Sequence, residues 1–174
     1  MSSAEHEPTS LPALTAARIA QRLDARGSVY GTDKDGDLVG RWDGHPFWFI
    51  TLGQSKEYLQ VRGRWARQVP GTEFGNVLLG ANAWSETMVW PKVFVRIEAE
   101  QVAVYTEHTV DYEHGVTDEQ LDLHLTIGIA SALRFFAQLD ERYPEAVPTV
   151  PVERPADPPA APIAYHDPAR PTLD

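Results

Sequence analysis

Two groups of side chains are of the types that hold metal ions. Asp33-Lys-Asp-Gly-Asp37 begins like a calcium-binding loop. Such a loop needs glycine at its sixth position and a bidentate glutamate at its twelfth. Leu38 and Gly44 stand at those positions, so we interpret the segment as an acidic hairpin turn.

The second group surrounds the end of a predicted strand. His108 and His114 flank Asp111 and Glu113, but this spacing matches no recurring ligand pattern. The chain has no cysteine, which removes thiolate ligands and nucleophiles together. We therefore predict no metal site.

Sequence motifs of the common enzyme classes are also missing from the chain. It contains no Gly-x-Ser-x-Gly elbow, no phosphate-binding loop and no dinucleotide fingerprint. We predict that the protein is not an enzyme and that it uses no cofactor.

A pair of arginines is the first candidate for a binding site. In the predicted strand 59–67, Arg62 and Arg64 share the polar face of a chain that is otherwise acidic. Two interpretations stay open. The pair binds an acidic partner segment, or it forms cross-strand pairs with acids such as Asp43 or Glu107.

Tryptophan is the second candidate, because it is enriched where protein interfaces are tightest. Most of the five should lie in the core, and an exposed remainder would mark an interface. We take Trp48, Trp65 and Trp84 as candidate partner-binding residues together with the two arginines. The full set is Trp42, Trp48, Trp65, Trp84 and Trp90.

Bulk properties limit the protein's class and partners. The chain has 174 residues, 43% of them hydrophobic, which suits one globular domain with tails. A net charge of −10 repels nucleic acid and acidic membrane surfaces. No apolar run is long enough to span a bilayer, and the acidic N-terminus is not a secretory signal. We expect a cytoplasmic protein.

Hydrophobic periodicity predicts three helices and five strands, and therefore an α+β fold with a five-stranded antiparallel sheet packed by helices. The last helix opens with a capping box, Thr117-Asp-Glu-Gln120. The predicted elements are a helix from Ser10, strands at 38–42, 47–52 and 59–67, a helix from Thr72 to the residue before Pro91, strands at 92–98 and 102–112, and a helix from Thr117 to Tyr143.

Strand 47–52 and the last helix carry more apolar residues than one face requires. A helix that is apolar most of the way round is buried on more than one side. We therefore expect a homodimer.

Proline marks the C-terminal boundary of the domain. Nine of the fourteen prolines lie between residues 144 and 174, where they block helices and sheet ladders. We predict a disordered N-terminal tail over 1–10, one domain over 11–145 and a Pro-rich disordered tail over 146–174.

Three segments resemble the actinobacterial branch of the YbjN family, whose fold is similar to that of type III secretion chaperones. They are Asn82-Ala-Trp84 followed by Trp90-Pro-Lys-Val-Phe-Val95, Asp111-Tyr-Glu-His-Gly115 running into the capping box, and Phe135-Phe-Ala-Gln-Leu-Asp140. The order helix-β-β-β-helix-β-β-helix is the same.

The resemblance implies a non-enzymatic sensory-transduction regulator or chaperone-like adaptor that binds an unidentified protein partner. A small-molecule-sensing domain with a Trp-lined pocket is the alternative. A closed pocket would favour sensing, and an exposed apolar patch would favour the adaptor.

Overall fold

The computed structural model describes residues 10–149. Of the predicted tails over 1–10 and 146–174, residues 1–9 and 150–174 lie outside the described residues. The elements are α1 Ala16–Ala25, β1 Tyr30–Thr32, β2 Leu38–Trp42, β3 His45–Leu52, β4 Tyr58–Arg64, β5 Arg67–Pro70, the 3₁₀ turn Gly71–Glu73, α2 Phe74–Thr87, β6 Lys92–Glu98, β7 Gln101–Asp111, α3 Asp118–Arg142 and β8 Val147–Pro148.

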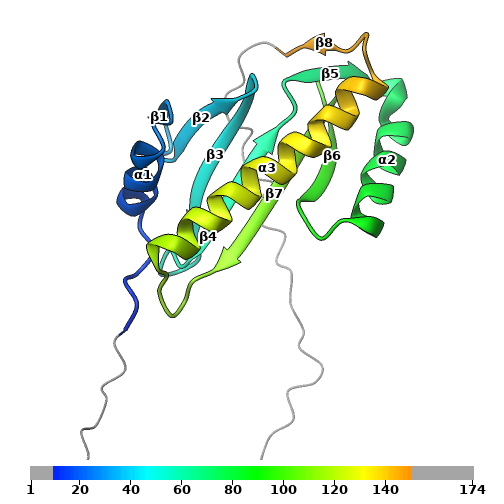
Figure 1. Cartoon of the computed structure of the whole chain (residues 1–174). Helices are drawn as coiled ribbons and strands as arrows, with labels where there is room; N and C mark the ends of the chain where they lie inside the picture. The colour runs from blue at the N-terminus through cyan, green and yellow to red at the C-terminus, as the bar shows by residue number, and fades with distance from the viewer. Residues whose placement is uncertain (1–9, 150–174) are drawn as a thin grey trace, which may run out of the picture.

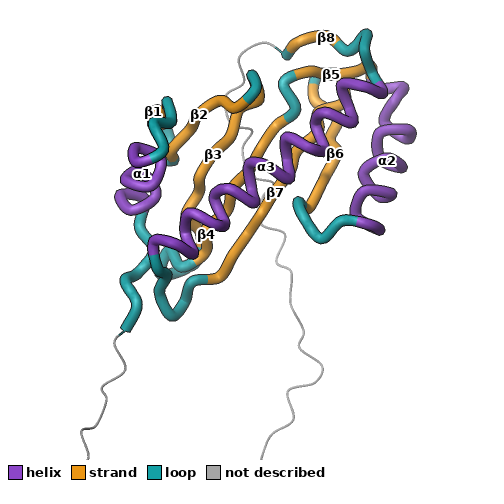
Figure 2. The backbone as a smooth tube through the Cα atoms, viewed as in Figure 1, coloured by secondary structure: helices purple, strands orange, loops and turns teal. Residues whose placement is uncertain are grey.

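The strands form one antiparallel sheet in the order β1-β2-β3-β4-β7-β5-β8, and β6 pairs with β7 as well. All three helices lie on one side of it, with α3 crossing the middle (Figures 1 and 2). Phe47, Val61 and Val104 point to that side and form the core with the helices. The other side has no helix among the described residues, and we call it the helix-free sheet face.

The prediction of a five-stranded sheet is wrong, because the sheet has eight strands. The additional strands β1, β5 and β8 are two to four residues long. They hold residues such as Gly31, Pro70 and Pro148 rather than an alternating apolar pattern. Such short strands form only when a neighbouring strand offers its backbone, so the sequence carries little sign of them.

The predicted strand 59–67 is divided in two. Within the break, the Trp65 amide still donates to the Val104 carbonyl over 3.0 Å. The next amide, that of Ala66, turns instead to the Nδ1 atom of His45 at 2.9 Å. A side chain from β3 thus takes the place of a strand partner, and the chain bends before β5.

The first helix begins later than predicted. Thr15 caps α1, since its hydroxyl accepts a hydrogen bond from the Arg18 amide, whereas Ser10 lies in the extended segment before it. The Pro12 carbonyl accepts from the Val116 amide at 2.9 Å and from the Arg18 guanidinium at 2.9 Å. These contacts hold the segment before α1 against the entry to α3.

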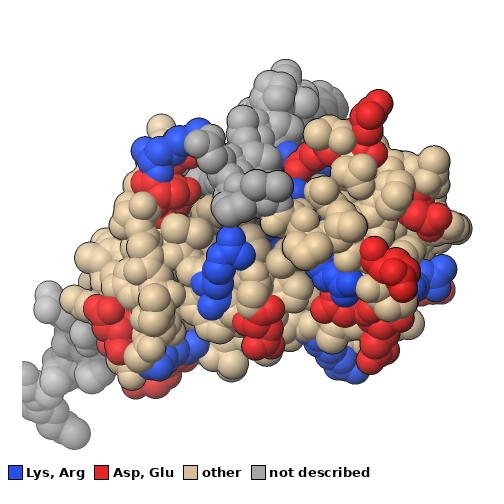
Figure 3. All heavy atoms as spheres, turned by 90° about the horizontal axis from the view of Figure 1, so that it is seen from above, with Lys and Arg blue, Asp and Glu red and all other residues tan. Residues whose placement is uncertain are grey.

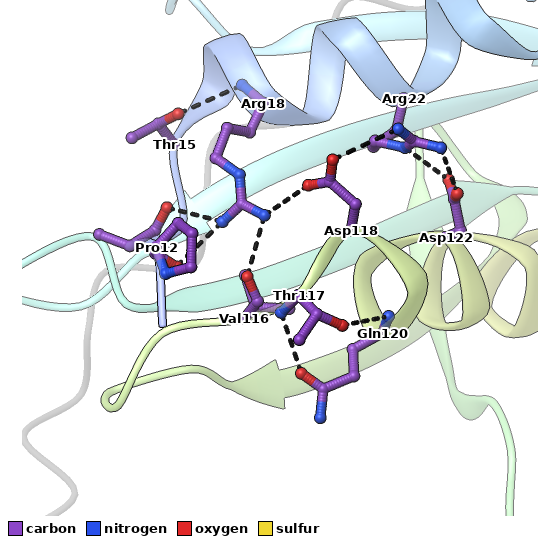
Figure 4. A network of polar contacts seen from close by, with 10 residues as sticks. Pro12, Thr15, Arg18, Arg22, Val116, Thr117, Asp118, Gln120 and Asp122 are labelled. Atoms are coloured by element: carbon purple, nitrogen blue, oxygen red, sulfur yellow. Dashed lines mark hydrogen bonds and ion pairs between the residues drawn. The ribbon is translucent and has the colours of Figure 1, made fainter. Parts of the chain in front are cut away.

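Charged side chains then fasten α1 to the first turns of α3 (Figure 4). Arg18 reaches Asp118 at 2.6 Å, Arg22 reaches Asp122 at 2.5 Å, and Arg26 donates to Asp122 at 3.0 Å. The hydrogen bond from Arg22 lowers the pKa of Asp122 below its usual value.

Local signals in the sequence are confirmed where they were strongest. The Thr117 hydroxyl accepts from the Gln120 amide, and the Gln120 side chain accepts from the Thr117 amide. Asp43 and Gly44 both have positive φ, at 49° and 82°, as a two-residue hairpin turn requires.

Helix α3 lies very close to the sheet. A β-carbon built on Gly128 would stand 2.7 Å from the Cβ atom of Val61, so only glycine permits this approach.

No helix of the described part is long and apolar enough to cross a membrane.

The first residues of the predicted C-terminal tail belong to the domain. Ala146 is buried, and its carbonyl accepts from the Arg67 guanidinium at 2.7 Å. Val147 and Pro148 pair with β5, and the Thr149 amide donates to the Ala66 carbonyl at 2.9 Å. The described part of the chain therefore ends against the bend between β4 and β5.

Candidate functional site

The two arginines of β4 lie on the helix-free sheet face and are buried there. Arg62 is 7% exposed and Arg64 is 3% exposed. Arg62 contacts Glu107 of β7 at 2.8 Å, and Arg64 contacts Glu98 of β6 at 2.9 Å. The cross-strand alternative therefore describes their contacts, with Glu98 in place of Asp43.

Aromatic rings complete the centre of this face. The Tyr105 hydroxyl donates to Glu98 at 2.8 Å, and the Arg64 guanidinium lies 5.6 Å from the centre of the Tyr105 ring. Phe94 stacks on Tyr105 with 5.1 Å between the ring centres. Burial raises the pKa of the Tyr105 phenol, which stays protonated and donates.

The three tryptophans selected from the sequence are all buried, so none of them is an exposed anchor. Trp65 and Trp84 are core residues, 0% and 4% exposed. Trp65 donates to Asp140 at 2.9 Å. Trp48 lies on the helix-free sheet face and is 2% exposed.

The exposed tryptophan is Trp90, which the selection missed. It is 44% exposed, and Val89 beside it is 82% exposed. Both residues lie between the end of α2 and β6. The signal in the sequence was Pro91, which ends the helix and leaves the preceding apolar residues in a loop.

These residues border a groove between α2 and α3, which we call the α2–α3 groove. The part next to Trp90 has a volume of about 490 Å³ and is lined largely by apolar side chains. A second part of about 660 Å³ continues along the helices. Arg134 borders both parts and lies 6.0 Å from the centre of the Trp84 ring. The residues shared by the two parts are Trp84, Thr87, Met88 and Arg134.

A histidine pair lies beside the groove, under Trp90. The Nε2 atom of His108 is 3.0 Å from the Nδ1 atom of His124, and Trp90 meets the His108 ring edge to face. Burial and the neighbouring His124 lower the pKa of His108 to about 4. The pair is therefore neutral near pH 7. It joins β7 to α3 across the core side of the sheet.

The two groups of side chains that resembled metal ligands in the sequence do not form a metal site in the structure. The Asp33 carboxylate accepts from the amides of Asp35 and Asp37 at 3.0 Å each, as an acidic turn does. His108 points to His124, while His114 lies on an exposed turn. Residues 10–149 contain no group of three metal-ligating side chains.

Charge is mixed on the visible surface. Seen from above, acidic and basic side chains alternate over the described part of the molecule rather than gathering by sign (Figure 3). Recognition on this side would therefore depend on local pairs rather than on a long-range field.

Fold and surfaces together define a class: a small α+β domain with one helix-covered sheet face, one helix-free face and an exposed apolar groove. A family model matches residues 15–141, and it is that of YbjN, "Putative bacterial sensory transduction regulator". The chain belongs to the YbjN family, and the predicted resemblance is confirmed at this level.

Solved structures agree on the fold. The crystal structure of YbjN from E. coli, titled "a putative transcription regulator", has a TM-score of 0.67 and 14% identity, covering 82% of this chain and all of that one. An uncharacterized protein from Methanothermobacter thermautotrophicus has a TM-score of 0.51 and 13% identity, covering 75% and 99%. At such identities the likeness concerns the fold alone. No curated protein matches the chain.

Proposed function

We propose that the protein is a non-enzymatic, cytoplasmic adaptor of sensory transduction, chaperone-like in its use of protein contacts, and that it works as a homodimer. The family description supports a role in sensory transduction. The likeness to secretion chaperones and the actinobacterial branch remain part of this proposal. The observation that carries it is the exposed apolar lining of the α2–α3 groove.

Large apolar side chains around this groove remain in contact with water. Trp90 and Val89 line the groove, and Leu123, one helical turn before the lining residue Ile127, is 54% exposed. Leu123, Ile127 and Ala130 follow one another at helical spacing along α3, on the side turned away from the core. Contiguous exposed apolar surface of this kind marks interaction sites, because each Å² removed from water contributes about 25 cal/mol.

The occupant we assign to this groove is a second copy of the chain. A two-fold axis beside α3 would bring the same apolar stripe of both copies together, as an isologous interface requires. The two α3 helices would then each be covered on a second side, which answers the excess of apolar residues in that helix.

Light scattering on the full chain at tens of micromolar tests the proposal. The wild type should have the mass of a dimer, and Ile127→Glu should have that of a folded monomer, because two carboxylates would meet at the axis. Thr126→Glu, at the neighbouring exposed position, is the matched control and should remain dimeric. A monomeric wild type, or a dimeric Ile127→Glu, would show that the groove is not the dimer interface.

The groove also keeps small-molecule sensing as a second candidate. Its larger part, about 660 Å³, is of the size that small ligands occupy and is lined by Trp84, Arg134 and Gln138. A metabolite that raises the thermal midpoint of the monomeric Ile127→Glu variant would favour sensing over self-association.

A further inference from the structure

The helix-free sheet face carries apolar and aromatic side chains that are almost completely buried, although no helix of the described residues covers it. Strand alternation directs Trp48 and Ile50 of β3 and Tyr105 of β7 to the side opposite the core residues Phe47, Val61 and Val104. All three helices lie on the core side (Figure 1). The exposed fractions of Trp48, Ile50 and Tyr105 are only 2%, 2% and 0%. Tryptophan is so large that it is rarely buried this completely.

We propose that the helix-free sheet face is a docking surface for an extended, proline-rich segment, and that residues 150–174 of the same chain occupy it. The surface is distinct from the α2–α3 groove, so this inference goes beyond the proposed function.

Several buried polar groups on the face have no hydrogen-bond partner, and a docked segment could supply one. The Nε and Nη1 atoms of Arg64 and the Oε1 atom of Gln60 are buried and unpaired. A buried polar group without a partner destabilises the fold, so a segment that supplies the partner is favoured. A polyproline II segment has no internal hydrogen bonds, so its carbonyl oxygens are available to the Arg64 guanidinium.

One edge of the face has a hollow of suitable shape. It has a volume of about 380 Å³ and is lined by Val39, Arg41, Pro46 and Trp48, among other residues of β1 to β3. Proline-rich segments commonly dock in aromatic-lined grooves, because their backbone loses little entropy on binding. The seven prolines among residues 150–174 match this kind of site.

The chain leaves the domain at the rim of this face. Thr149 is fixed to Ala66, two residues beyond Arg64, and 25 residues follow it. At ~3.1 Å per residue a polyproline II segment of this length spans about 75 Å. The face is about 20 Å across from β2 to β6, at ~4.8 Å per strand, so the segment is long enough to cross it.

Charge also fits. Residues 150–174 contain four acidic and two basic side chains. On the face, five basic side chains from the three strands β2, β4 and β6 outnumber the acidic Glu98, Glu107 and Asp111. They are Arg41, Arg62, Arg64, Lys92 and Arg96.

The absence of cysteine makes a direct test on the full chain simple. Single cysteines at Ala156, Ala160 and Ala164, one per variant, carry a bimane dye that tryptophan quenches on contact. A tether of this length gives an effective concentration on the order of millimolar, so a segment with a free Kd of ~0.1 mM would be mostly docked. At one or more positions, Trp48→Phe should therefore raise emission at least two-fold.

Trp90→Phe is the matched control, because Trp90 lies on the helix side and should not affect the dye. A synthetic peptide of residues 150–174, added in excess, should also raise emission, which keeps the test independent of any effect of Trp48→Phe on folding. If neither Trp48→Phe nor the added peptide changes the emission, the proposal is overturned.

Two further measurements of quenching distinguish docking within one chain from docking on a second copy. Quenching that rises with protein concentration would mean that the segment docks on a second copy, which also overturns docking within one chain. Quenching should persist in the monomeric Ile127→Glu variant. The two proposals can therefore fail separately.

Discussion

Burial of His108 predicts an acid-sensitive contact between β7 and α3. Its exposed fraction is 2%, and its pKa is about 4 in the folded chain. In the unfolded chain the pKa returns to about 6.5. Between these values the unfolded state binds more protons, so His108 reduces the free energy of unfolding as the pH falls. The contribution is absent above about pH 6.5 and complete below about pH 4.

The size of the effect follows from these two values. The free energy of unfolding falls by about 1.4 kcal/mol at pH 5.5 and by about 2.5 kcal/mol at pH 4.5 because of His108. The titratable groups against His108 in the described part are His124, at 3.0 Å, and Tyr112, whose ring contacts His124. Burial lowers the pKa of His124 as well, so it acts in the same direction.

Urea unfolding between pH 7.5 and 4.5 measures this loss. His108→Phe keeps an aromatic ring in the site and removes the titration, so its stability should fall by about 2.5 kcal/mol less than that of the wild type over this range. His114→Gln, on an exposed turn, should behave like the wild type. Equal pH dependence of His108→Phe and the wild type would refute the reasoning.

Two further predictions concern packing and buried charge. Gly128→Ala gains about 1 kcal/mol of helix propensity but overpacks against Val61 at a cost of about 1–3 kcal/mol, so it should lower the free energy of unfolding. The control Gly80→Ala meets nothing within 4 Å and should raise it by up to about 1 kcal/mol. If both variants are stabilised in urea unfolding, the close approach of α3 to the sheet is contradicted. Glu107→Ala removes the carboxylate that Arg62 contacts and should cost about 3–5 kcal/mol, as for other buried pairs. A cost below about 1 kcal/mol would mean that the pair behaves as an exposed one.

Local chemistry was what the sequence alone determined about this protein. The capping box at Thr117 and the turn at Asp43-Gly44 each depend on residues within four positions of one another, so they act in any tertiary context. The α+β class, the three helices and the family follow from periodicity and from the quoted segments. The double-sided burial of β3 was also visible, because its apolar residues do not alternate.

Only the tertiary structure decided which surfaces are available. Arg62 and Arg64 alternate as exposed residues would, but their pairing with Glu107 and Glu98 depends on strands that are 34 to 45 residues away along the chain. The short strands β1, β5 and β8 exist because neighbouring strands supply backbone partners. Such contacts join residues distant in sequence, and no local pattern records them.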